Sequence, residues 1–121
     1  MHIEQHITTA RRIENSLQKC GPEDYEIKIE AAMLAGTHWL NVALHRRDVN
    51  PVSKDVFHTY LLTINEFRRL SVADAELVNA LADIENIRPP FVRGSWAGGE
   101  QAAERALALL RSIRNKALAE G

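Results

Sequence analysis

Hydrophobic residues recur every three or four positions along most of this chain, a spacing that is typical of amphipathic α-helices. The recurrence predicts helices over residues 2–20, 23–47, 55–70, 72–87 and 100–119. Because every long segment has the helical period, we expect an all-α fold without a sheet. A chain of 121 residues fits one domain of ordinary size. We therefore predict a single up-and-down bundle of about five helices over residues 1–121.

The segment 23–47 differs from the others because it is apolar on nearly every side. A helix with this pattern is buried among its neighbours, so we expect it to be the central helix of the bundle. Charged residues interrupt it too often for a membrane span, and these are Lys28, Glu30, Arg46 and Arg47. Its small residues allow neighbouring helices to approach closely, and they are Ala31, Ala32, Ala35, Gly36 and Ala43.

One polar ridge runs along this helix. Thr37, Asn41 and His45 are spaced four apart, and His38 lies three before Asn41, so the side chains share one face. A buried imidazole has to satisfy both its N–H and its lone pair. Three interpretations stay open: core histidines bonded to a neighbouring helix, a ridge facing a ligand or a metal, or an exposed ridge at an interface. We predict that His38 is buried and structural, and we name His38, Asn41 and His45 as ligand-binding candidates.

Two further histidines, His2 and His6, lie one helical turn apart near the start of the chain. This spacing can chelate a metal ion, but the first turns of a chain fray, so we expect both to be exposed. His6 also belongs to an apolar seam of the first helix. The other members of that seam are Ile3, Ala10, Ile13, Leu17 and Cys20. We name no metal ligand and no cofactor from the sequence.

The boundaries of the third and fourth helices follow from turn and cap signals. Asn50-Pro51 places a loop at residues 48–54. Ser71 followed by Asp74 has the pattern of a helix cap, which predicts a break, with a mere kink as the alternative. The helix before this break should bury one face, made of Phe57, Tyr60, Leu61, Ile64 and Phe67.

Residues 88–99 form the longest stretch that we expect to be irregular, because it holds two prolines and three glycines. It combines Arg88, Arg93 and Trp96 with a glycine pair that opens the last helix. Free N–H groups at a helix start favour anions, and arginine suits phosphate or carboxylate. The stretch is therefore a candidate anion or nucleotide site. Alternatively, Phe91 and Trp96 plug the end of the bundle, and the arginines pair with acidic side chains.

Composition narrows the function classes. Fifteen basic and sixteen acidic residues give a net charge of −1, which argues against nucleic acid or an anionic membrane as the main partner. Cys20 is the only cysteine, so a reducing cytoplasm is the expected compartment. The phosphate-binding, dinucleotide-binding and nucleophile-elbow motifs are absent from the sequence. We assign no catalytic residue and favour a protein that is not an enzyme.

Two patches, EAAMLAGTHWLNVAL with its mid-helix His38 and IENIRPPFVRG before the last helix, resemble the HEPN superfamily of small helical bundles. The resemblance implies a homodimer that acts on RNA or partners a nucleotidyltransferase in a toxin–antitoxin pair. Ribonuclease members carry an arginine four to six residues before a histidine. No arginine here has a histidine at that spacing, so no catalytic residue is carried over.

Together these observations predict a non-catalytic helical interaction module. We expect a homodimer, with residues 100–119 offering a surplus apolar face through Ala102 and Leu109. A protein partner and a small anion or nucleotide near residues 88–99 fit this prediction; membrane binding does not. The alternative is an RNA-acting enzyme of HEPN type, or a ligand- or metal-binding bundle that uses the ridge of His38 and His45.

Overall fold

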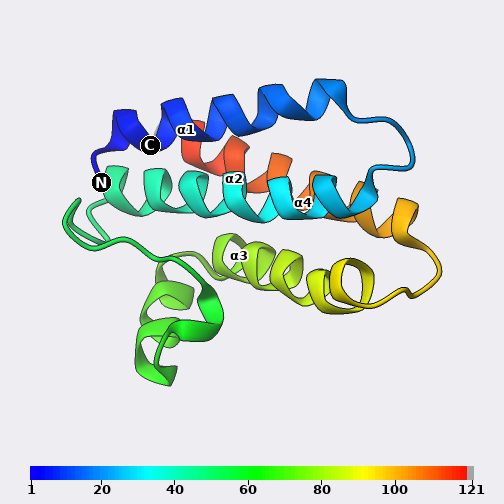
Figure 1. Cartoon of the computed structure of the whole chain (residues 1–121). Helices are drawn as coiled ribbons and strands as arrows, with labels where there is room; N and C mark the ends of the chain where they lie inside the picture. Colours follow the sequence, from blue (N-terminus) through cyan, green and yellow to red (C-terminus); the bar gives the residue numbers. More distant parts are fainter. Residues whose placement is uncertain (120–121) are drawn as a thin grey trace.

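The computed structural model describes residues 1–119. They contain four α-helices, which are α1 (Ile3–Ser16), α2 (Tyr25–Arg46), α3 (Ile64–Arg88) and α4 (Gly99–Leu118) (Figure 1). Short helical turns follow α1 at Leu17–Lys19, precede α3 at Thr59–Leu61 and follow α3 at Pro89–Arg93. No strand occurs among the described residues. The prediction of an all-α protein is therefore confirmed, whereas five α-helices were expected and four are found.

Helix α2 contacts α1, α3 and α4, and α3 also packs on α4. Successive long helices run back along one another, with α1 on one side of α2 and α3 on the other (Figure 1). Gly36 explains part of the close packing, because a Cβ at this position would lie 3.4 Å from Ile113 and 3.5 Å from Leu81. The apolar character of α2 on several sides thus matches its contacts with three helices.

A buried tryptophan links three helices through polar contacts. Trp39 on α2 is fully buried, and its Nε1 donates to Glu14 of α1 at 2.8 Å. The other carboxylate oxygen of Glu14 accepts from Arg114 of α4 at 2.6 Å. A buried indole N–H needs such a partner, so the Glu14 carboxylate fixes α1 and α4 against the middle of α2.

The predicted break within residues 55–88 lies at Asp74 and not at Ser71. Helix α3 is continuous from 64 to 88 except at Asp74, whose φ of −163° and ψ of 95° are not helical. The Asp74 carboxylate accepts from Leu77 N at 3.1 Å, as an N-cap does. The two parts of α3 consequently point in different directions (Figure 1), which corresponds to the predicted kink.

Residues 55–63 are not helical in the way that was predicted, because α3 begins only at Ile64, after a cap by Thr63. Four residues of the expected buried face are exposed, namely Phe57, Tyr60, Leu61 and Ile64. Phe67 is half-buried and packs against the core. The physical reason is a side chain of α2, Asn41, that holds the backbone at Val56 in place, as described below.

Two expectations near α4 also need correction. Residues 89–93 of the stretch predicted to be irregular form a π-helical turn that continues directly from α3, with the two prolines at its first positions. Ala102 and Leu109 are half-buried against the core and so are not a surplus exposed face. Within residues 1–119, no helix is both long enough and apolar enough to cross a membrane.

Candidate metal centre

Three histidines and one aspartate meet at one end of the bundle. At this end α1 begins and α2 ends, beside the segment that joins α2 to α3 (Figure 1). His6 comes from α1, His38 and His45 from α2, and Asp55 from the connecting segment. His6 is 2% exposed and His45 is 5% exposed. Ionisable side chains buried to this degree need partners, and the half-buried Asp55 bonds to both of them, while the half-buried His38 bonds to His6.

One carboxylate oxygen of Asp55 is shared by two imidazoles. Asp55 Oδ1 lies 2.8 Å from His45 Nε2 and 3.0 Å from His6 Nε2. The second oxygen, Oδ2, accepts from the amino group of Met1 at 3.0 Å. The three atoms His6 Nε2, His45 Nε2 and Asp55 Oδ1 therefore converge on one point, and the side-chain ligand atoms of these residues all lie within 4.8 Å of one another.

The second nitrogen of His45 decides where its proton lies. His45 Nδ1 is 3.0 Å from the backbone carbonyl oxygen of Asn50, which can only accept, so Nδ1 carries a proton. In a neutral ring Nε2 is then a bare lone pair, yet it faces the Asp55 carboxylate. Two acceptors do not stay this close without a cation, which is either an additional proton on the pair or a metal ion that both atoms would ligate at a slightly larger separation.

His6 also faces Asp55 with its Nε2, but its other ring nitrogen faces a histidine and not a carbonyl oxygen. Its Nδ1 lies 2.8 Å from His38 Nδ1, so one of these two nitrogens donates and the other accepts. If His6 Nε2 serves as a ligand, His6 Nδ1 carries the proton and donates to His38. Metal-binding histidines commonly donate their other N–H to an acceptor of this kind, which fixes the ring.

Burial and hydrogen bonds shift the pKa values of His6, His38 and Asp55. Burial lowers the pKa of His6 more than Asp55 raises it, and burial together with His6 lowers the pKa of His38. Burial works against ionisation of Asp55, but hydrogen bonds from His6, His45 and the Met1 amine outweigh it and lower the pKa of Asp55 to about 2. Neutral imidazole and ionised carboxylate are the forms that bind metal ions.

Asn41 positions the connecting segment that carries Asp55. Its side-chain amide donates to Val56 O at 2.8 Å and accepts from Val56 N at 2.8 Å, and it also donates to Thr37 O at 2.9 Å. The amide thus pairs with the backbone of Val56 as a neighbouring strand would. Because Asp55 precedes Val56, this pairing fixes the direction in which the carboxylate enters the cluster.

Arg69 fixes the other acceptor of the site. Its guanidinium donates to Val49 O at 2.9 Å and to the side chain of Asn50 at 2.5 Å. Asn50 is buried, and its backbone carbonyl accepts the hydrogen bond from His45 Nδ1. Helix α3 therefore supports the turn after α2 and, through it, the orientation of the His45 ring.

The donor set of two imidazoles and one carboxylate suits a zinc-like ion. In a tetrahedral zinc site with Zn–N distances of about 2.0–2.1 Å, neighbouring ligand atoms lie about 3.3 Å apart. The two separations from Asp55 Oδ1, 2.8 and 3.0 Å, are hydrogen-bond distances, so the ligand atoms would move apart by about 0.3–0.5 Å to hold the ion. Two histidines and one carboxylate form a common ligand set for zinc and for non-haem iron(II). Three protein ligands leave at least one coordination position for water or substrate.

A pocket of about 300 Å³ adjoins the cluster. Two of the three candidate ligands, His6 and Asp55, line this pocket, and His45 does not. His6, His38 and Asp55 form part of its wall, together with His58 and the side chains of Leu34 and Phe57. His58 is held in place because its Nδ1 donates to Glu85 at 2.9 Å, and Glu85 also accepts from the backbone N–H and hydroxyl of Thr59.

The structure brings together only half of the candidates that the sequence suggested. His38, Asn41 and His45 all belong to the cluster or its support. Arg88 instead forms an ion pair with Glu30 of α2. Among the candidates of the 88–99 stretch, Arg93 and Trp96 are exposed.

The glycine pair before α4 has a packing role. Gly98 has a φ of +93°, and a Cβ on Gly99 would lie 2.5 Å from the Tyr25 ring. Trp96 contacts Phe91 edge-to-face. The pairing of Arg88 with an acid agrees with the alternative interpretation of this stretch, whereas Trp96, at 69% exposure, does not plug the end of the bundle.

Two residues of the cluster were missed by the sequence reasoning. His6 was expected to be exposed, and that prediction is wrong. Its membership of the apolar seam of α1 was the available signal, since residues of that seam face α2. Asp55 had no such signal, because its place depends on the contact between Asn41 and Val56, which lie 15 residues apart.

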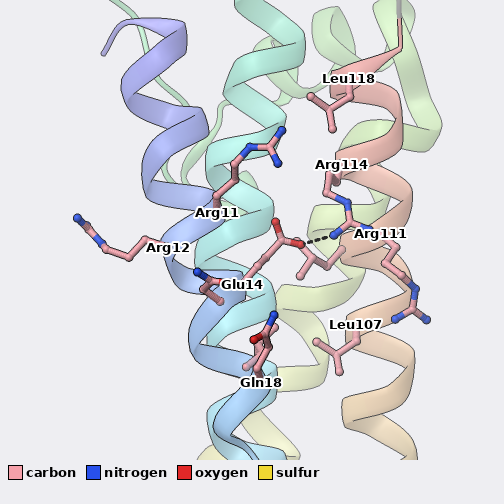
Figure 2. A pocket seen from close by; sticks show the side chains of 11 residues that line it. Arg11, Arg12, Glu14, Gln18, Leu107, Arg111, Arg114 and Leu118 are labelled. Carbon is pink, nitrogen blue, oxygen red and sulfur yellow. Dashed lines mark hydrogen bonds and ion pairs between the residues drawn. The ribbon is translucent and has the colours of Figure 1, made fainter.

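A second hollow, of about 620 Å³, lies between α1 and α4 and is lined by four arginines (Figure 2). Arg114 is neutralised by its ion pair with Glu14 at 2.6 Å, and Arg11 lies over the Trp39 ring. Figure 2 shows that Arg12 and Arg111 point away from each other on opposite sides of the hollow. These guanidinium groups do not converge, so we do not select this hollow as an anion site.

Comparisons with known protein families, with curated proteins and with solved structures found no match for this chain. The resemblance to the HEPN superfamily therefore stays a hypothesis that rests on the two sequence patches.

Proposed function

We propose that this protein binds one divalent transition-metal ion of the zinc or iron(II) class, with His6 Nε2, His45 Nε2 and Asp55 Oδ1 as its ligands. The observation that carries the proposal is His45, whose two ring nitrogens both face acceptor oxygens. A metal ion at Nε2 satisfies the ring and the carboxylate together, without an additional buried proton. In this proposal α2 is the central helix, because it supplies His45 and the supporting residues His38 and Asn41.

The open coordination position favours a catalytic centre over a purely structural one. Structural zinc sites usually have four protein ligands, whereas catalytic sites have three and keep one position for water or substrate. A metal ion bound here would polarise a water or a substrate oxygen at the pocket. We therefore infer a metal-dependent enzyme, with hydrolysis as the reaction class that a zinc-bound water supports best.

The test is metal stoichiometry and affinity in variants. Protein stripped with a chelator is dialysed against zinc, manganese, nickel or, without oxygen, iron(II), and its metal content is measured by mass spectrometry. The wild type should retain about one ion per chain, and His45→Ala and Asp55→Asn should retain almost none. His2→Ala is the matched control, because His2 lies one turn before His6 but is exposed.

Two outcomes would contradict the proposal. Wild-type protein that retains no stoichiometric metal would contradict it, and an imidazolium at His45 paired with Asp55 would then be the explanation of the contacts. Nitrogen-15 chemical shifts of His45 would then report protons on both ring nitrogens. Metal that His45→Ala still retains, but His2→Ala loses, would place the site at the exposed start of α1 instead.

A second candidate is the homodimeric interaction module expected from the sequence, and a different observation favours it. Five large apolar side chains between residues 57 and 72 are more than 60% exposed. They are Phe57, Tyr60, Leu61, Ile64 and Val72. Exposed apolar clusters of this kind mark interaction surfaces, and part of this segment projects from the bundle (Figure 1).

Light scattering at tens of micromolar tests this candidate. We expect the mass of a dimer for the wild type and of a monomer for Ile64→Glu, because a buried, unpaired charge opposes association. Ala108→Glu is the control, since Ala108 is exposed on α4. Equal masses for the wild type and Ile64→Glu would contradict an interface at this segment.

A further inference from the structure

The pocket beside the candidate metal centre has two kinds of wall. Its inner wall is polar and is formed by His6, His38 and Asp55. Leu34 of α2 and Phe57 of the connecting segment belong to its apolar wall. Leu34 is 49% exposed and Phe57 is 69% exposed, so each has apolar surface that a bound molecule can cover.

Several polar groups of the wall are already engaged by the protein. The hydroxyl of Thr37 donates to Met33 O at 2.8 Å, and both ends of the Asn41 amide are used as described above. His38 uses Nδ1 on His6, and His58 uses Nδ1 on Glu85. Within residues 1–119, the ring atoms left for a ligand are therefore Nε2 of His38 and Nε2 of His58.

The proton positions favour an oxygen-rich head group. With His6 bound to a metal through Nε2, its Nδ1–H donates to His38, so the proton of a neutral His38 lies on Nε2. This N–H can donate to a ligand oxygen. A divalent ion with Asp55 as its single anionic ligand keeps a net positive charge, which attracts an anion. A carboxylate or hydroxamate head group satisfies both conditions.

We propose that the pocket binds a small oxygen-chelating anion with an apolar tail, whose head group occupies the open metal position and whose tail lies against Leu34 and Phe57. The inference rests on the proposed metal site and adds the class of ligand to it. At about 30 Å³ per water-sized group, the pocket volume of 300 Å³ corresponds to roughly ten such groups. An aryl or short acyl group with its chelating head is of this size.

The experiment compares two hydroxamates that share a head group and differ in their tail. Zinc content is measured first, and then acetohydroxamate and benzohydroxamate are titrated calorimetrically into the zinc-loaded protein. We expect benzohydroxamate to bind at least about tenfold more tightly, which corresponds to about 1.4 kcal/mol and to burial of some 55 Å² of additional apolar surface.

Variants locate the origin of this preference. Leu34→Ser and Phe57→Ser should each reduce the affinity ratio to about threefold or less, with zinc content unchanged, because neither residue is a proposed ligand. Val72→Ser is the control, since Val72 is 85% exposed on α3 and is absent from the pocket wall. It should retain the wild-type ratio.

The outcomes separate this inference from the proposal on which it rests. If the wild type binds zinc but holds both hydroxamates equally, the apolar tail site is overturned and the metal site stands. If the ratio persists in both serine variants, benzohydroxamate binds elsewhere and the inference is also overturned. If the wild type retains neither zinc nor iron(II), both proposals fail.

Discussion

Replacing Asn41 with alanine should weaken both the fold and the metal site, although Asn41 is not a proposed ligand. The amide makes three hydrogen bonds, to Val56 N, Val56 O and Thr37 O. Val56 is buried, at 4% exposure, so its backbone groups would lose their partners away from water. Each buried group left without a partner lowers the free energy of unfolding by about 1–3 kcal/mol. Because water would reach some of these groups after the segment relaxes, we expect a total loss of about 2–4 kcal/mol.

Urea denaturation of the metal-free protein measures this cost directly. The control is Asn79→Ala, because Asn79 is exposed on α3, and surface substitutions usually change stability by less than about 0.5 kcal/mol. A loss below about 0.5 kcal/mol for Asn41→Ala would refute the reasoning, because the segment at Val56 would then not depend on the amide.

The same variant should bind zinc about 10–100-fold more weakly, as groups that orient metal ligands usually do. Asp55 immediately precedes Val56 and would lose its fixed direction. Competition with a chromophoric chelator gives the zinc affinity of both variants. Unchanged affinity in Asn41→Ala, beside reduced stability, would show that Asp55 is positioned by other contacts or is not a ligand.

The remaining predictions concern packing and charge away from the metal site. Thermal unfolding should show Gly36→Ala more stable by about 0.5–1 kcal/mol from helix propensity, since its Cβ meets neighbours no nearer than 3.4 Å. Gly99→Ala should lose about 1–3 kcal/mol, because its Cβ would overlap the Tyr25 ring. Asp74→Ala should lose about 1–2 kcal/mol in urea denaturation through its cap and ion pairs. Burial opposes ionisation of Asp74, but contacts from Arg47, Leu77 N and Lys116 lower its pKa. The contribution of Asp74 to the free energy of unfolding is therefore full above about pH 3.9 and is lost as the pH falls further. Asp74→Asn should accordingly reduce the loss of stability at acid pH.

The periodicity of the sequence was enough to predict the long helices. The helix predicted over residues 23–47 corresponds to α2, Tyr25–Arg46, and the helix predicted over residues 100–119 corresponds to α4, Gly99–Leu118. These segments form helices because their apolar faces meet one another, so local spacing and tertiary packing agree. The kink near Ser71 and Asp74 followed equally from a local cap pattern.

Residues 55–63 show where local reasoning fails. Phe57, Tyr60, Leu61 and Ile64 have helical spacing, but their backbone is held by the Asn41 amide and by Glu85, which accepts from Thr59. Both contacts join residues that are far apart in the sequence, and the spacing of hydrophobic residues gives no information about such contacts. Tertiary hydrogen bonds thus override the local pattern and leave those four side chains exposed.

The candidate site was half predictable for the same reason. The polar ridge of α2 is a local feature, and it indicated His38, Asn41 and His45, which make their polar contacts in or beside the cluster; their role as ligand-binding residues stays a prediction. His6 and Asp55 join them only because α1 packs antiparallel to α2 and the connecting segment folds back. A single sequence gives no direct information about such contacts between distant residues.

The most direct test of the metal centre is anomalous X-ray diffraction from crystals grown with zinc, recorded on both sides of the zinc absorption edge. The proposal predicts one anomalous peak per chain at about 2.0–2.2 Å from His6 Nε2, His45 Nε2 and Asp55 Oδ1, with further density toward the pocket. A crystal that contains zinc but shows no peak among these three atoms, with Asp55 Oδ1 still at hydrogen-bond distance from both rings, would contradict it.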